Sequence, residues 1–192
     1  MADLAPALLR WLHFLFGITW IGLLYYLNLV NVRMMASLDA GARPAVIQAN
    51  LRRVMAWFRH SSWLTVVIGL LLAYVLYWQN GHFADTNSSK TILIGGLLGI
   101  IMMLNVWGII WRMQQRIIAA AAAGQPADPS WGRTGLYASR VNFVLSFPML
   151  LFMGGATHYP MDWPMIIVAG VIAAVIGFLV VFTVQKWAAP SF

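Results

Sequence analysis

The sequence contains no cysteine and no glutamate, and only 9% of its 192 residues are charged. The absence of cysteine excludes disulfides, thiolate metal sites, iron–sulfur clusters and the C-x-x-C-H attachment of a c-type haem. Soluble domains are roughly a quarter charged, so the shortage of charge argues against an ordinary globular protein. Hydrophobic residues, by contrast, make up 61% of the chain, and its mean hydropathy is +0.78. These values favour a multi-pass membrane protein and exclude a disordered chain.

Five long runs contain no Asp, Glu, Lys or Arg, and each is long enough to cross a bilayer as a helix of about 20 residues. They are Trp11–Val32, His60–Ala84, Thr91–Trp111, Val141–Met161 and Trp163–Gln185. The first run is too long for the core of a signal peptide, so we count it as a span. The sequence therefore predicts one all-α domain over 1–192, a bundle of five transmembrane helices with spans at about 10–32, 57–78, 91–112, 140–158 and 163–186.

The basic residues divide unequally between the two sides of this predicted bundle. One side has Arg33, Arg43, Arg52, Arg53, Arg59, Arg112, Arg116, Arg133, Arg140 and Lys186, and the other has Arg10 and Lys90. The positive-inside rule then predicts an amino terminus outside and a carboxyl terminus in the cytoplasm, in a bacterial inner membrane. The net charge of +7 accordingly reflects membrane topology, and we expect no nucleic-acid partner.

Proline and glycine indicate where the helices begin, end and approach one another. Pro44 suits a first helical turn, so the second helix is expected to begin around Ile47, before its span. The third helix is expected to continue past the membrane until Gly124 stops it. Gly95 and Gly99 form a GxxxG pattern, which favours close helix packing, although a smooth face of this kind also suits a flat cofactor.

His13 is the most informative residue, because an ionisable side chain inside a span is a candidate functional group. Arg10, His13, Gly17 and Trp20 share one face of the first helix. A b-type haem needs an imidazole ligand, room for a flat macrocycle and a cation near its propionates. His13, Gly17 and Arg10 are candidates for these three roles. The alternative is an interfacial histidine that is hydrogen-bonded to a neighbouring carbonyl.

The other three histidines differ in their predicted position. His158 lies at the outer end of the fourth helix, where it either ligates the same iron as His13 or only ends the helix. His60 lies at the cytoplasmic start of the second span, about 20 Å or more from His13. It is a candidate for a second cofactor beside Arg59, or an interfacial residue. His82 is a weaker candidate, since a solvated loop histidine is the simpler interpretation.

Several segments resemble the bacterial membrane-bound urate hydroxylase family (PuuD type), which has the urate oxidase N-terminal membrane domain. The similarity is carried by RWLHFLFGITWIG (Arg10 to Gly22), WFRHSSWLTVVIG (Trp57 to Gly69), the long segment LNVWGIIWRMQQRIIAAAAAGQPADPSWG and the triplet His158-Tyr159-Pro160. Longer members of that family end in a c-type cytochrome domain. This sequence has no C-x-x-C-H motif, so it resembles a short form without that domain.

The resemblance implies a membrane redox module, and it points to His13 and His158 as metal ligands. We therefore expect a haem b protein, with one or two haems, that exchanges electrons with a periplasmic cytochrome c or another respiratory-chain partner. Two alternatives stay open. The chain is either a urate hydroxylase-like oxidoreductase, or a cofactor-free structural subunit of a larger membrane complex or homo-oligomer.

Overall fold

The computed structural model describes residues 4–184, and this part of the chain consists of helices and short connections without β-strands. The elements are α1 (Leu4–Tyr25), η1 (Tyr26–Asn31), α2 (Val32–Ser37), α3 (Arg43–Val46), η2 (Ile47–Leu51), α4 (Arg52–Leu76), η3 (Trp78–Asn80), α5 (Asn87–Asn105), η4 (Val106–Ile110), α6 (Trp111–Ala122), α7 (Pro129–His158), α8 (Trp163–Leu179) and η5 (Val180–Val184). Here η1, η2, η4 and η5 are π-helical turns, and η3 is a 3-10 turn.

Consecutive elements join into five helices that are long and apolar enough to span a membrane. They are Leu4–Ser37, Arg43–Asn80, Asn87–Ala122, Pro129–His158 and Trp163–Thr183. Many large apolar side chains on these helices are exposed, as expected for surfaces that face lipid. The predicted fold class, an all-α bundle of five transmembrane helices, is confirmed, and the chain is a multi-pass membrane protein.

Helix ends follow from local chemistry. Pro44 occupies the first turn of α3, and the third long helix ends at Ala122, just before Gly124 with its φ of +65°. Asp128 begins α7 by accepting a hydrogen bond of 2.8 Å from the Ser130 N–H, which holds the pKa of this carboxyl below its usual value. Asp162 likewise begins α8 by accepting from the Met165 N–H at 3.0 Å.

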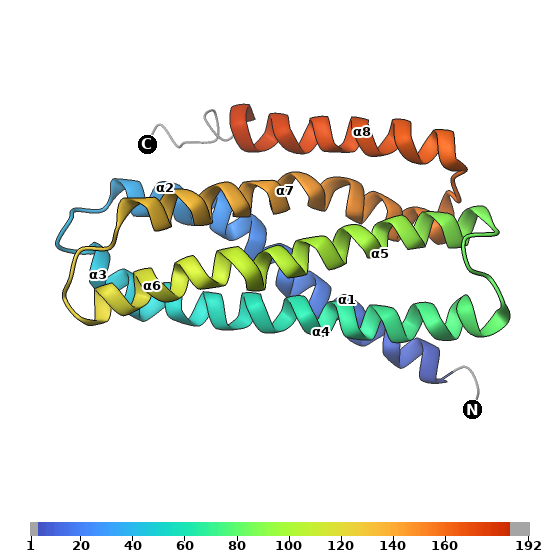
Figure 1. Cartoon of the computed structure of the whole chain (residues 1–192), viewed down its shortest axis with the longest axis horizontal. Coiled ribbons are helices and arrows are strands. Elements are labelled where there is room, and N and C mark those ends of the chain that lie inside the picture. Colours follow the sequence, from blue (N-terminus) through green and yellow to red (C-terminus); the bar gives the residue numbers. More distant parts are fainter. Residues whose placement is uncertain (1–3, 185–192) are drawn as a thin grey trace.

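The two ends of the bundle differ in charge, as the sequence predicts. The connections after α2 and after α6 lie at one end, together with the start of α7, and this end has the clustered arginines (Figure 1). Arg10 and Lys90 lie near the opposite end, where α4 finishes and α5 begins. Lys186, which the sequence assigns to the arginine side, lies outside the described residues. We refer to the two ends as the arginine-rich end and the opposite end.

The helices pack in neighbouring pairs: α1 with α4, α5 with α7, and α7 with α8 (Figure 1). Glycine allows close approach in the second and third pairs. A Cβ atom on Gly95 would lie 3.2 Å from the Cβ of Phe152, so Gly95 of the GxxxG pattern is a packing residue. A Cβ atom on Gly177 would lie 2.8 Å from the Phe147 ring and 3.1 Å from the Val144 carbonyl oxygen. Pro148 frees that carbonyl, because it has no N–H to donate.

Asparagine side chains join the helices inside the bundle. The Nδ2 atom of Asn105 donates to Asn142 Oδ1 at 2.7 Å, and Asn142 Nδ2 donates to the Met102 carbonyl at 2.9 Å. Asn28 Nδ2 donates to the Leu24 carbonyl at 2.9 Å and to Ser139 Oγ at 2.8 Å. A side-chain donor inserted into the helix ladder accompanies the π-helical turn η1 that contains Asn28. These asparagines therefore act as polar contacts between helices.

Candidate functional site

The α1–α4 interface is formed by small residues on α4. Ser61, Thr65 and Gly69 recur every four residues and so lie on one face of the helix. Ser61 and Thr65 are buried, and their hydroxyls bond to carbonyls of their own helix, at Trp57 and Ser61 respectively. This face therefore presents little bulk and no free hydroxyl donor to α1.

His13 of α1 fits against this face. Its Nδ1 lies 2.9 Å from the carbonyl oxygen of Thr65, and a Cβ atom on Gly69 would lie only 2.7 Å from its Cε1. The imidazole thus occupies space that any side chain at position 69 would take. The alternative interpretation of His13, a histidine bonded to a neighbouring carbonyl, correctly describes this contact.

The hydrogen bond to Thr65 determines what the other ring nitrogen can do. A carbonyl only accepts, so Nδ1 must carry the proton, and in the neutral ring Nε2 then has the free lone pair. Within the described residues, Nε2 has no hydrogen-bond partner. Histidines that bind metals commonly donate their second N–H to a carbonyl in this way, which fixes the tautomer and the ring orientation. The arrangement fits an imidazole that could bind a metal through Nε2.

Gly17 and Arg10 differ in how they relate to this imidazole. A Cβ atom on Gly17 would lie 3.7 Å from Thr65 Cγ2, in ordinary contact. Gly17 therefore faces α4 together with His13, and the space beside it is taken by the Thr65 side chain. Arg10 lies one turn before His13, is exposed, and makes no hydrogen bond or ion pair with the rest of the described chain. It is free to meet an anionic group.

His158 is the last residue of α7 and is exposed. Near it, the carboxyl end of α7 is held to α5 by a bond of 2.9 Å from the Met161 N–H to Thr91 Oγ1. In Figure 1 the amino-terminal half of α1 runs beside α4, away from the end of α7. The structure thus places His13 and His158 on different helix pairs and does not bring them together. Ligation of one iron by both stays a prediction.

His60 is exposed on α4, near the arginine-rich end. Its Nε2 accepts from Arg59 Nε at 3.2 Å, and its Nδ1 lies 3.4 Å from Trp63 Nε1. A neutral imidazole has one acceptor nitrogen, so only one of these two bonds can exist at a time. Both ring nitrogens of His60 therefore face hydrogen-bond donors, one from Arg59 and one from Trp63. This arrangement suits an interfacial role better than the binding of a metal.

The separation of His60 from His13 along the axis of α4 can be estimated from the residues that His13 contacts. His13 contacts α4 at Thr65 and Gly69, which are five and nine residues after His60 in the sequence. At 1.5 Å per residue, the axial separation is about 7 to 14 Å. This axial offset is short because α1 begins farther out than expected, at Leu4, and the second long helix already begins at Arg43.

His82 is the solvated loop histidine that the sequence suggested. It is exposed and its Nδ1 bonds to Asp85 Oδ2 at 2.9 Å, and this bond holds the pKa of the Asp85 carboxyl below its usual value. Among residues 4–184 there is no cluster of three or more histidines and carboxylates able to hold a metal ion.

Sequence reasoning found His13 but missed Thr65 and Gly69. Their contribution depends on a contact between two helices, which a single helix pattern does not specify. A signal was nevertheless present, because the four-residue spacing of Ser61, Thr65 and Gly69 is the small-residue pattern of close membrane helix pairs.

Comparison with known proteins gives one match. A family model described as "Urate oxidase N-terminal" matches residues 83–189, more than half of the chain. The match begins before α5 and includes α7, α8 and His158, whereas α1 and α4, with His13 and Gly69, precede it. Searches of curated proteins and of solved structures gave no match to the chain.

Proposed function

Since the chain belongs to the urate oxidase N-terminal family, we propose that it is a membrane redox protein that binds haem b through His13. The observation that carries the proposal is the hydrogen bond of 2.9 Å from His13 Nδ1 to the Thr65 carbonyl oxygen. That bond prepares Nε2 as a ligand nitrogen inside a membrane-spanning helix pair. A half-buried imidazole held in this way inside a membrane-spanning helix is a candidate functional group.

Each residue near the imidazole has a distinct task in this proposal. Thr65 holds the protonation state of the ring through its backbone carbonyl, and Gly69 leaves the space that the ring occupies. Arg10 is the exposed cation one turn away, placed to pair with a propionate. The haem would supply reversible one-electron chemistry, while these side chains and the apolar surroundings tune its potential.

The expected partners follow from this role and from the membrane setting. Electrons would pass to or from a periplasmic cytochrome c or another respiratory-chain protein. The opposite end of the bundle, which includes Arg10, would then face the periplasm of a bacterial inner membrane, as the arginine distribution predicts. His158 at the same end is the proposed second ligand, and because the structure keeps it apart from His13, it would reach the haem by a rearrangement when haem binds.

The decisive experiment is a reduced-minus-oxidised absorption spectrum of the purified protein in detergent, with pyridine haemochrome quantification. We expect a b-type signal that is lost in His13→Ala. The matched control is His82→Ala, which removes an exposed loop histidine bonded only to Asp85 and should leave the haem content unchanged. Full haem content and an unchanged spectrum in His13→Ala would refute the assignment.

His158 needs its own test, because it is separated from His13 in the structure. If His158 is the second ligand, His158→Ala should retain haem but convert a low-spin spectrum into a high-spin one, since one axial position opens. An unchanged spectrum would remove His158 from the ligand set and leave the assignment of His13 intact.

A second candidate function is favoured by the family match itself. In this alternative the chain is a urate hydroxylase-like oxidoreductase that transfers electrons from a heterocyclic substrate to a cytochrome. Anaerobic addition of urate to the oxidised protein distinguishes the two functions. Reduction of the haem by urate would support the enzyme, whereas reduction only by a cytochrome or quinol donor would support the electron carrier.

A further inference from the structure

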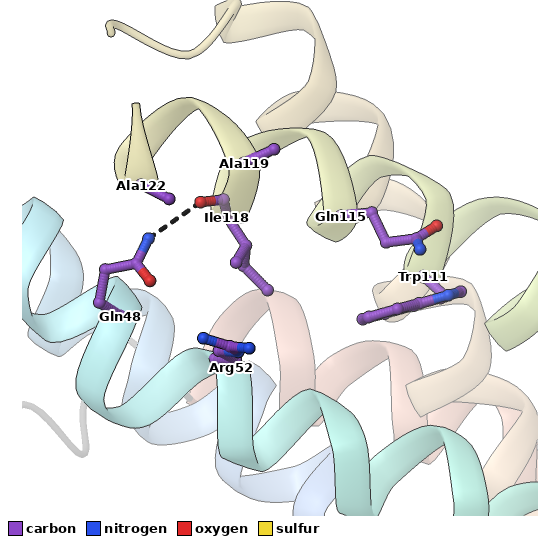
Figure 2. A pocket seen from close by; sticks show the side chains of 7 residues that line it. All are labelled: Gln48, Arg52, Trp111, Gln115, Ile118, Ala119 and Ala122. Carbon is purple, nitrogen blue, oxygen red and sulfur yellow. Dashed lines mark hydrogen bonds between the residues drawn. The ribbon is translucent and has the colours of Figure 1, made fainter. Parts of the chain in front are cut away.

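A crevice of about 440 Å³ lies at the arginine-rich end, between the start of the second long helix and α6. Its walls are Gln48, Arg52, Trp111, Gln115, Ile118, Ala119 and Ala122 (Figure 2). Gln48 Nε2 donates to the Ile118 carbonyl at 2.9 Å, which ties the two walls together. The crevice is therefore a gap between two helices that are held together by a hydrogen bond. It is lined by one cation (Arg52), two amides (Gln48 and Gln115) and apolar side chains.

The charge of Arg52 is not balanced by the protein. Arg52 makes no hydrogen bond or ion pair within the described residues, where the one ion pair is His82 with Asp85 at the opposite end of the bundle. The wall contains no carboxylate. Neighbouring Arg59 stacks on Trp111, with its Cζ 3.8 Å from the ring centroid, so it adds positive potential without a counterion. The crevice therefore attracts an anion.

An apolar track continues from the crevice toward the middle of the membrane. Trp107 lies one turn from Trp111 and donates its indole N–H to the Arg59 carbonyl at 3.2 Å. Trp107 is 36% exposed, Trp63 38% and Leu104 59%. An anion held at Arg52 would thus have a lipid-facing aromatic surface directly beneath it. An acyl chain can pack against this apolar surface, whereas a free inorganic anion makes no favourable contact with it.

We infer that this crevice binds the phosphodiester headgroup of an anionic phospholipid, with its acyl chains along Trp63, Trp107 and Leu104. Arg52 pairs with the phosphate, and the amide N–H groups of Gln115, with the second N–H of Gln48 that the bond to Ile118 leaves available, donate to headgroup oxygens. The arginine-rich end is the predicted cytoplasmic end, where anionic lipids gather and basic pockets between helices recognise them. This inference does not depend on haem or on any redox activity.

The test is native mass spectrometry of the purified full-length protein in detergent, titrated with phosphatidylglycerol. Phosphatidylcholine with the same acyl chains is the zwitterionic comparison. We expect one preferred phosphatidylglycerol, whose affinity falls about fivefold in Arg52→Gln, the loss typical of one interfacial arginine. Gln115→Leu should give a smaller loss in the same direction. Both side chains are exposed, so neither change removes a buried contact.

Arg53→Gln is the matched control, because it makes the same charge change one residue away on an exposed side chain outside the crevice. Equal losses in Arg52→Gln and Arg53→Gln would show a diffuse charge effect and overturn the site. Inorganic phosphate and the short-chain dihexanoyl phosphatidylglycerol serve as competitors, which distinguish binding of free phosphate from binding of a lipid headgroup. Competition by inorganic phosphate at concentrations equal to the lipid would overturn the proposed lipid.

Discussion

The α1–α4 and α7–α8 pairs both pack through glycine, but different side chains fill the two gaps. At Gly69 the neighbour is the imidazole of His13, and at Gly177 it is the phenyl ring of Phe147. A phenyl ring has no polar atom, so its contact is complete once it is packed. The imidazole has one nitrogen bonded to Thr65 and a second without a partner in the described residues. Glycine therefore marks close contact in both places, and the entering side chain decides whether chemistry is available there.

The largest effect is expected from Gly69→Val. Its Cβ alone would lie 2.7 Å from His13 Cε1, so the imidazole must leave the Thr65 carbonyl. Overpacking of this kind costs about 1–3 kcal/mol, and we expect the haem to be lost as well. Haemochrome content and thermal unfolding in detergent measure the two consequences. Gly22→Val is the control, because a Cβ on Gly22 meets nothing within 4 Å. Haem retained at wild-type level in Gly69→Val would show that the gap at Gly69 is not needed for haem binding.

Gly177→Val should destabilise the protein by a similar amount, about 1–3 kcal/mol, because its Cβ would lie 2.8 Å from the Phe147 ring. The haem spectrum of the folded fraction should not change, since this gap contains no ligand. The same two measurements apply. A spectral shift in this variant would show that the α7–α8 contact also shapes the cofactor site, contrary to the comparison.

Asn142→Ala tests polar contacts that have no proposed chemical role. It removes the bond of 2.9 Å to the Met102 carbonyl and the acceptor of Asn105. Each hydrogen bond between membrane helices contributes on average about 0.6 kcal/mol and at most about 1.7 kcal/mol, so the loss of two bonds should cost about 1 to 3 kcal/mol. Equilibrium unfolding in mixed detergent measures it. A loss of haem greater than the loss of folded protein would assign this network to the site.

The smallest effect concerns the loop at the opposite end. The hydrogen bond from His82 lowers the pKa of Asp85, so the stability it contributes is present above the unfolded pKa of about 4 and is lost as the pH falls through the folded value. Thermal unfolding of the wild type should therefore weaken below about pH 4 by slightly more than that of Asp85→Asn. Identical pH profiles would show that this exposed pair contributes nothing measurable.

The sequence predicted the fold well because its strongest signals are physical requirements of a bilayer. Charge-free runs longer than about 20 residues predict spans. The arginines other than Arg10 lie at one end of the bundle, as the sorting of basic residues predicts. Gly124 predicted the end of the third long helix, since it acts locally, whereas the second long helix begins at Arg43, beside Pro44 and four residues before the expected Ile47. The orientation of the bundle in the membrane stays a prediction.

The candidate site was predicted only in part. His13 was found because an ionisable residue in a span is unusual, whereas its partners on α4 depend on the distance and rotation between two helices. Gly17 was expected to leave room for a cofactor, but the structure places the Thr65 side chain beside it. Patterns along one helix identify which residues share a face, and they do not reveal what packs against that face.

The seating of His13 on Gly69 also has a consequence for assembly in the membrane. Membrane helices commonly insert independently and associate afterwards, without a hydrophobic force to align them. A slip of one helical turn, about 5.4 Å, would bring Thr65 or Ala73, which lie on the same face as Gly69, toward the imidazole in place of Gly69. Only one depth of α1 against α4 provides both the gap and the Thr65 carbonyl. The same contact that prepares a ligand nitrogen thereby fixes the vertical register of the two helices.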